Sequence, residues 1–136
     1  MHITDFSAAH LDAVIAMCVD QGWETLSEDP RRTLRSMLAP GALTLVAIDD
    51  RDQPVGFAHT LSDGHIQAYL ARLLVAEGSR RQGIGRALLE ASLRRSGALR
   101  LDLIAAEEAA PFYRSLPHHE WSGFRVVLQE LDGARS

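Results

Sequence analysis

A glycine-punctuated, arginine-rich segment holds the residue types in this chain best suited to chemistry. It runs from Leu73 to Leu89 with the sequence LLVAEGSRRQGIGRALL. The apolar start is typical of a strand, and a helical pattern follows from Gly83. The first N–H groups of a helix lack internal partners, and the macrodipole adds positive charge there. Because glycines let a ligand approach the backbone closely, the segment predicts an anion site suited to a pyrophosphate.

Two common phosphate-binding motifs do not fit this segment. A Walker loop needs Gly-Lys followed by Ser or Thr, and the chain contains no lysine, so its positive charges are arginines. A Rossmann fingerprint places a third glycine where Leu88 stands, and it normally follows the first strand of a domain. The open alternative is a glycine-rich helix start with solvated arginines, because short glycine patterns are weak signals.

Two motifs in the sequence resemble those of a known superfamily. Arg80-Arg81-Gln82-Gly83-Ile84-Gly85 matches Arg/Gln-x-x-Gly-x-Gly/Ala, the signature of the GNAT (Gcn5-related) N-acetyltransferases. Ala109-Ala110-Pro111-Phe112-Tyr113 resembles the second landmark of the family, an alanine followed shortly by Phe-Tyr. The order of expected helices and strands also matches, so the resemblance spans nearly the whole chain.

The resemblance implies acetyl-CoA as cosubstrate, bound without a metal. In the family, two parallel central strands splay apart and hold the pantetheine arm between them. In this chain they would be 65–76 and 98–104, and Leu73, Leu74 and Val75 would pair with pantetheine like an added strand. The pyrophosphate would be held by the amides of 81–86, with side chains reaching it from Arg80 and Arg86. The implied cofactor-binding residues are Leu73, Leu74, Val75, Arg80, Arg81, Gln82, Gly83, Ile84, Gly85 and Arg86.

Tyr113 matches the tyrosine that protonates the departing thiolate in many members of the family. The implied function is N-acetyl transfer to an amine of a small molecule or peptide, by direct attack through a tetrahedral intermediate. A phenol with a pKa of about 10 can donate a proton at neutral pH. The alternative role for Tyr113 is structural, as a helix residue that packs under the sheet. The corresponding alternative function is a noncatalytic acyl-CoA-binding or sensory module.

The sequence departs from the family pattern on the acceptor side. Ala106 stands where relatives often carry Asn, and Leu116-Pro117-His118-His119 replaces a usual Leu-Gly-Phe. The general base is unassigned, with His65 and Asp102 as the candidates to test, and a structural or solvated role is the simpler interpretation of each. Adjacent histidines in an extended segment point to opposite sides, so 118–119 predicts solvated side chains rather than a metal site.

The family commonly admits its acceptor beside the segment that joins the first two helices, which is 22–29 here. Glu24, Glu28 and Asp29 would attract a cationic amine, and Trp23 could form an apolar wall. A solvated acidic loop is the simpler alternative. The resemblance also allows a homodimer.

The expected elements form a single α/β domain over residues 1–136. The fold class is GNAT-like, with a mixed central sheet whose parallel central strands splay apart and are flanked by helices. Strands are expected over 2–6, 42–49, 55–61, 65–76, 98–104 and 124–131. The first helix follows Ser7 and carries an apolar stripe of Leu11, Val14, Ile15, Cys18 and Val19. Further helices are expected from Asp29-Pro30 to Pro40, from Gly83 to Ser96 and over 107–116.

Composition narrows the partner classes. The chain has 136 residues, 46% of them hydrophobic, and a net charge of −4. This balance disfavours nucleic acid as a partner, although a toxin-like enzyme that acetylates aminoacyl-tRNA remains a third hypothesis. The single cysteine, Cys18, cannot form an internal disulfide and is expected to be a buried hydrophobe. No uninterrupted apolar run approaches the roughly 20 residues that a membrane helix needs, and the start of the chain does not resemble a signal peptide. We therefore expect a cytoplasmic location and no membrane partner.

Overall fold

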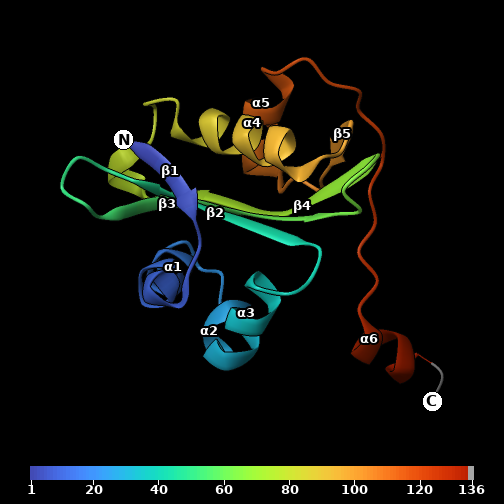
Figure 1. Ribbon diagram of the computed structural model, residues 1–136. Helices are drawn as coiled ribbons and strands as arrows, with labels where there is room; N and C mark the ends of the chain where they lie inside the picture. Colours follow the sequence, from blue (N-terminus) through green and yellow to red (C-terminus); the bar gives the residue numbers. More distant parts are fainter. Residues whose placement is uncertain (135–136) are drawn as a thin grey trace. The chain divides into compact units, whose positions relative to one another are not determined.

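The structure is a computed structural model that describes residues 1–134, shown in Figure 1. The chain divides into an N-terminal unit, Met1–Leu103, and a C-terminal unit that begins at Ile104. Within the described residues, the strands are β1 (His2–Asp5), β2 (Ala42–Ile48), β3 (Pro54–Ser62), β4 (Gln67–Val75) and β5 (Arg100–Asp102). The helices of the N-terminal unit are α1 (Leu11–Asp20), α2 (Thr25–Glu28), α3 (Pro30–Met37) and α4 (Ile84–Ser96).

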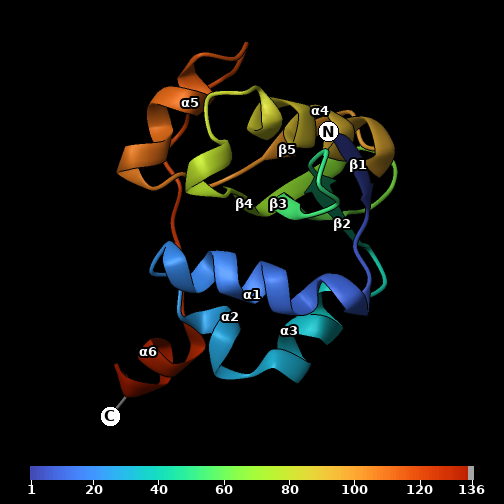
Figure 2. The same cartoon turned by 90° about the vertical axis from the view of Figure 1, so that its left-hand side faces the viewer.

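The five strands form one sheet in the order β1-β2-β3-β4-β5. The first three pairings are antiparallel, and β4 pairs with β5 in parallel. Helix α4 connects β4 to β5, as a parallel crossover requires. Helices α1 to α3 cover one face of the sheet and α4 covers the other (Figures 1 and 2). This arrangement confirms the expected α/β fold with a mixed sheet flanked by helices.

The face covered by α1 to α3 contains the main hydrophobic core. Phe57 of β3 is fully buried there, together with Val14 and Cys18 of α1 and Met37 of α3. The predicted stripe on α1 is correct at Val14 and Cys18 but wrong at Val19, which is 51% exposed. Met17 is buried in its place. Burial raises the pKa of the Cys18 thiol to about 11, so this cysteine is an unreactive packing group.

The other face packs against a stripe of α4. Gly56 lies beneath α4, where a Cβ atom would come within 3.2 Å of Leu88 Cδ1 and 3.1 Å of the Leu74 carbonyl oxygen. At the far end of the same stripe, Ser62 Oγ donates to the Ser96 carbonyl at 3.0 Å. The absence of a side chain at Gly56 therefore brings α4 close to the sheet, and the Ser62–Ser96 bond fixes its other end.

We expect Ser92→Ala to raise the free energy of unfolding by about 1 kcal/mol, because it removes a buried polar group that has no partner. The Ser92 hydroxyl on α4 is fully buried and makes no hydrogen bond within the structure. Urea unfolding would measure the change. Ser96→Ala is the matched control on the same stripe. Its hydroxyl donates to Leu93 O at 2.8 Å and accepts from Ala98 N at 3.1 Å, so this variant should lose stability. A clear loss in Ser92→Ala would indicate a buried water on that hydroxyl.

The C-terminal unit is helical where it is regular. After a short 3₁₀ turn at Glu107–Ala109 come α5 (Ala110–Arg114) and α6 (Leu128–Gly133). The helix expected over 107–116 is therefore split and shorter. The strand expected over 124–131 is wrong, because no strand of the described chain pairs with it. Its second half instead forms a helix with a local bond from Leu131 N to Val127 O at 2.9 Å. Alternating apolar residues form a strand only beside another strand, and Phe124 is 85% exposed.

None of the helices in residues 1–134 combines the length and the apolar character that crossing a membrane requires.

Candidate functional site

The parallel strands β4 and β5 are neighbours over only three residue pairs. Gln67 pairs with Arg100, Ala68 with Leu101 and Tyr69 with Asp102, where the pairing ends. The other edge of β4 stays paired with β3 as far as Val75. From Leu70 to Val75, no strand within residues 1–134 pairs with β4 on its β5 side. Such an edge can pair with an extended polar chain, although the Val75 carbonyl already accepts from Arg80 Nε.

An irregularity in β4 lies at the start of this open edge. His59 of β3 pairs with Arg72, but its neighbour Thr60 pairs with Leu70, which leaves Ala71 as an extra residue. A bulge of this kind bends the strand and increases its twist. Sequence analysis predicted β5 over 98–104, whereas the observed strand covers only Arg100–Asp102. The short β5 and the bulged β4 together leave Leu73, Leu74 and Val75 on the unpaired edge.

The open edge leads into the N-terminus of α4. Gly83 is the N-cap, with a left-handed φ of +79°, and Arg81 is also left-handed at +65°. The first intrahelical bond runs from Ala87 N to Gly83 O at 3.0 Å. The N–H groups of Ile84, Gly85 and Arg86 therefore have no acceptor within the helix. With the dipole of a 13-residue helix behind them, they form a site for an anion.

The arginine side chains of this turn and of the first turn of α4 differ in whether they already bond other residues. Arg80 Nε donates to the Val75 carbonyl at 3.0 Å, and its Nη2 donates to Gln21 Oε1. Arg86 pairs with Glu90 one helical turn later at 2.9 Å. Arg81 and Gln82 are exposed. Arg80 therefore connects the turn to the end of β4 and to the residue that follows α1. Backbone N–H groups supply the main donors of the anion site.

Sequence reasoning missed Gln21, which directly follows α1 and lies 59 residues before its partner Arg80. No periodicity or motif links the two positions, so only the fold could reveal the contact. Gln21 joins the helices on one face of the sheet to the turn that precedes α4.

Tyr113 lies on α5, in the C-terminal unit. It is half-buried, and its ring meets that of Phe112 edge-on with centroids 5.0 Å apart. Burial raises the pKa of the Tyr113 phenol above its ordinary value of 10. The hydroxyl therefore remains protonated throughout the neutral range, as a proton donor must.

A known family model matches the part of the chain that contains β4, the glycine turn and α4. Residues 40–116, more than half of the chain, match the family model described as "Acetyltransferase (GNAT) domain". The chain belongs to the GNAT acetyltransferase family. The match includes β4, the glycine turn, α4, β5 and α5, so it covers both motifs that sequence analysis singled out.

Solved structures resemble this GNAT domain over most of its length. A proposed acetyltransferase of Deinococcus radiodurans is 27% identical, with a TM-score of 0.63 over 74% of this chain and 71% of that one. A GNAT-family acetyltransferase of Streptococcus pneumoniae is 23% identical, with a TM-score of 0.70 over 93% of this chain and 96% of the other. An acetyltransferase of Trypanosoma brucei shares the fold at 17% identity, with a TM-score of 0.72 over 93% and 99%. A search of curated proteins finds no match.

The two candidate bases of the GNAT domain lie at opposite ends of the short parallel pairing. His65 lies in the turn before β4 rather than within the strand, and its N–H donates to Asp63 Oδ1 at 2.7 Å. Asp102 is the last residue of β5 and pairs with Tyr69. Both side chains belong to exposed residues. Asp102 therefore lies where the strands separate, and His65 lies before the pairing begins.

Asp29 and the adjacent histidines at 118–119, which the sequence also singled out, have local partners. Asp29 accepts from Arg32 N at 3.2 Å as the N-cap of α3, with Pro30 at the first position, as predicted. His118 bonds the Leu116 carbonyl at 2.7 Å, whereas His119 stacks on Trp121 with ring centroids 5.7 Å apart. Among residues 1–134, no three His, Cys, Asp or Glu side chains gather as metal ligands would.

Proposed function

We propose that residues 1–136 act as one N-acetyltransferase domain that transfers the acetyl group of acetyl-CoA to a primary amine. The observation that carries this proposal is the separation of β4 from β5 after Tyr69, on an edge that leads into the glycine-capped N-terminus of α4. The site suits a ligand with a polyamide arm and a pyrophosphate, because a strand edge and a helix start bind those two groups.

Each part of the site has a proposed task. The backbone of Leu73, Leu74 and Val75 pairs with the amides of the pantetheine arm. The N–H groups of 81–86 hold the pyrophosphate, and the exposed side chains of Arg81 and Gln82 lie beside it. Arg80 keeps the turn in place through its bonds to Val75 and Gln21.

The proposed reaction needs two proton movements. The neutral amine forms a C–N bond with the thioester carbonyl carbon, and the C–S bond breaks as the tetrahedral intermediate collapses. Tyr113 donates its proton to the departing sulfur and is reprotonated from solvent. The amine loses its proton to a base, for which His65 and Asp102 are the candidates to test. Acetylated amine and CoA are the products.

We expect Gly83→Glu to weaken acetyl-CoA binding by about tenfold or more, equivalent to about 1.4 kcal/mol. The variant places a carboxylate at the anion site, and like charges repel. Isothermal titration with acetyl-CoA measures the affinity directly. Gly64→Glu is the matched control, because Gly64 also has a left-handed φ, +81°, and a Cβ atom there would meet nothing within 4 Å. Equal affinities in the two variants would contradict a pyrophosphate site at Gly83.

Turnover separates this enzyme from a noncatalytic acyl-CoA-binding module. Thiol release from acetyl-CoA, followed across a panel of amines, is expected only for the enzyme. Saturable acetyl-CoA binding with no turnover on any amine, peptide or amino acid would favour the binding module instead.

A further inference from the structure

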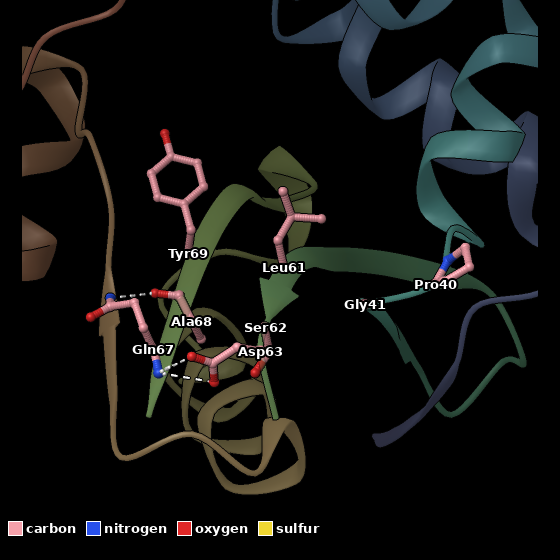
Figure 3. Close-up of a pocket in the computed structure, with 8 residues that line it drawn as sticks. All are labelled: Pro40, Gly41, Leu61, Ser62, Asp63, Gln67, Ala68 and Tyr69. Carbon is pink, nitrogen blue, oxygen red and sulfur yellow. Dashed lines mark hydrogen bonds between the residues drawn. The ribbon is translucent and has the colours of Figure 1, made fainter. Parts of the chain in front are cut away.

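The sheet face that carries α1 to α3 has an uncovered apolar hollow at one end. The hollow has a volume of about 510 Å³, and its apolar wall comes from Pro40, Leu61, Ala68 and Tyr69 (Figure 3). Figure 3 shows the side chains of Leu61 and Tyr69 projecting from the same side of the sheet. We call this feature the Tyr69 hollow. Its volume lies within the range of about 300–1,000 Å³ typical of small-molecule sites.

Strand register explains why the hollow lies at this end. Ala42, Leu61 and Tyr69 are direct neighbours across β2, β3 and β4. One row further along, Thr44 pairs with His59, which is only 2% exposed beneath the helices. Leu61, by contrast, is 43% exposed. The helical cover therefore ends between these two rows and leaves apolar side chains accessible in the row that follows.

Three polar side chains that line the hollow, Ser62, Asp63 and Gln67, are already bonded within the protein. Ser62 Oγ donates to the Ser96 carbonyl, and Gln67 Oε1 accepts from Arg100 Nε at 2.6 Å. Asp63 Oδ1 accepts from the N–H groups of His65 and Ile66 at 2.7 and 2.8 Å. A polar ligand would have to displace bonds that the protein already makes, which gives it little net gain. An apolar ligand group gains contact area without that loss.

The charge of the hollow suits an amine. Backbone hydrogen bonds from Ile66 and His65 lower the pKa of the Asp63 carboxyl, so it is ionised at neutral pH. Its negative charge attracts an ammonium ion as the amine approaches. The residues that line the hollow include no positively charged side chain, and the Arg100 guanidinium beside it is bonded to Gln67 Oε1.

The hollow also borders the place where the proposed reaction would occur. Tyr69 is the last residue of β4 that pairs with β5, and the open edge begins at the next residue. A small ligand whose apolar part contacts Tyr69 therefore lies next to the point where β4 and β5 separate, which is the proposed site of the pantetheine arm.

We propose that the Tyr69 hollow binds the apolar part of the acceptor, which is a small primary amine with an aromatic or branched aliphatic group. The proposal rests on the proposed acetyltransferase function and adds the substrate class. It differs from the expectation that the acidic segment 22–29 attracts the acceptor, because it places the apolar group of the acceptor at Leu61 and Tyr69.

Steady-state kinetics with 2-phenylethylamine, spermidine and a short peptide with an apolar N-terminus test the substrate class. We expect kcat/KM to be about tenfold or more higher for 2-phenylethylamine than for spermidine, because apolar contact provides the discrimination. A preference for spermidine would overturn the proposal, and a preference for the peptide would overturn its restriction to small amines.

Truncation of Leu61 tests whether the amine binds in the Tyr69 hollow. We expect Leu61→Ala to raise KM for 2-phenylethylamine about tenfold while KM for acetyl-CoA stays constant. Tyr69→Ala should act in the same direction. Leu38→Ala is the matched control, because Leu38 is 54% exposed at the end of α3 and does not line the hollow. An unchanged amine KM in both hollow variants would overturn the proposal while leaving the acetyltransferase function intact.

Calorimetric titration of 2-phenylethylamine into CoA-saturated protein tests the hollow independently of turnover. Binding that weakens in Leu61→Ala but not in Leu38→Ala supports the hollow even if the protein catalyses no transfer. In that event the proposed function fails and the binding site stands. Equal binding to wild type and Leu61→Ala overturns the site.

Discussion

Tyr113→Phe is expected to lower kcat for thiol release by about 10²-fold or more, because it removes only the hydroxyl that would protonate the departing sulfur. Affinity for acetyl-CoA should remain unchanged, since the proposed binding groups lie on β4 and the turn before α4. Single-turnover kinetics with saturating amine would measure the chemical step, and calorimetry would measure the affinity. A kcat within twofold of wild type would mean that solvent protonates the thiolate.

The pH dependence provides a second test of Tyr113. Its phenol acts in the protonated form, and burial raises its pKa above 10. The donor is therefore mainly protonated below pH 10, and its contribution falls as the pH rises through the raised pKa. The wild-type rate should rise as the amine deprotonates and should not decline through tyrosine ionisation before pH 10. In Tyr113→Phe, any decline above pH 10 that comes from this phenol should disappear.

Gly97→Ala is expected to destabilise the protein by about 2–5 kcal/mol, which combines the cost of a left-handed alanine with that of a backbone clash. Gly97 caps the C-terminus of α4 with a φ of +77°. A Cβ atom there would lie 2.6 Å from the carbonyl oxygen of Gly64, in the turn between β3 and β4. Urea unfolding monitored by circular dichroism would measure the loss.

Gly22→Ala is the control for Gly97→Ala. Gly22 has a φ of +85° after α1, and a Cβ atom there would meet nothing within 4 Å. Its loss should be limited to about 1–2 kcal/mol, the cost of the left-handed conformation. Equal losses in the two variants would show that the contact between Gly97 and Gly64 carries no energy.

The contact at Gly97 also bears on the functional site. Just after it, Leu99 N and Arg100 N both donate to the Ile66 carbonyl, at 3.0 and 3.2 Å. The turn before β4 therefore holds the chain that leads from α4 into β5. Because this anchoring fixes where β5 begins, it also fixes the short register that ends at Tyr69 and Asp102. A variant that displaces Gly97 should disturb the separation of β4 from β5 and also lower the stability.

The sequence alone was sufficient for the features that depend on nearby residues. The helical repeat after Gly83 predicted α4 as it is observed, and Asp29-Pro30 predicted the start of α3. The glycine turn indicated an anion site because helix starts have the same free N–H groups in any fold. These features need only local backbone geometry, so a short stretch of sequence contains the necessary information.

Only the tertiary structure decided the features that need a distant partner. The apolar alternation over 124–131 predicted a strand, but strands require neighbours, and the described chain supplies none there. The early end of β5, the bond between Arg80 and Gln21 and the uncovered row at Tyr69 likewise depend on segments far apart in the chain. The sequence therefore determined the glycine turn before α4 and the family, and tertiary packing decided where the strands separate and which apolar surface lies beside that point.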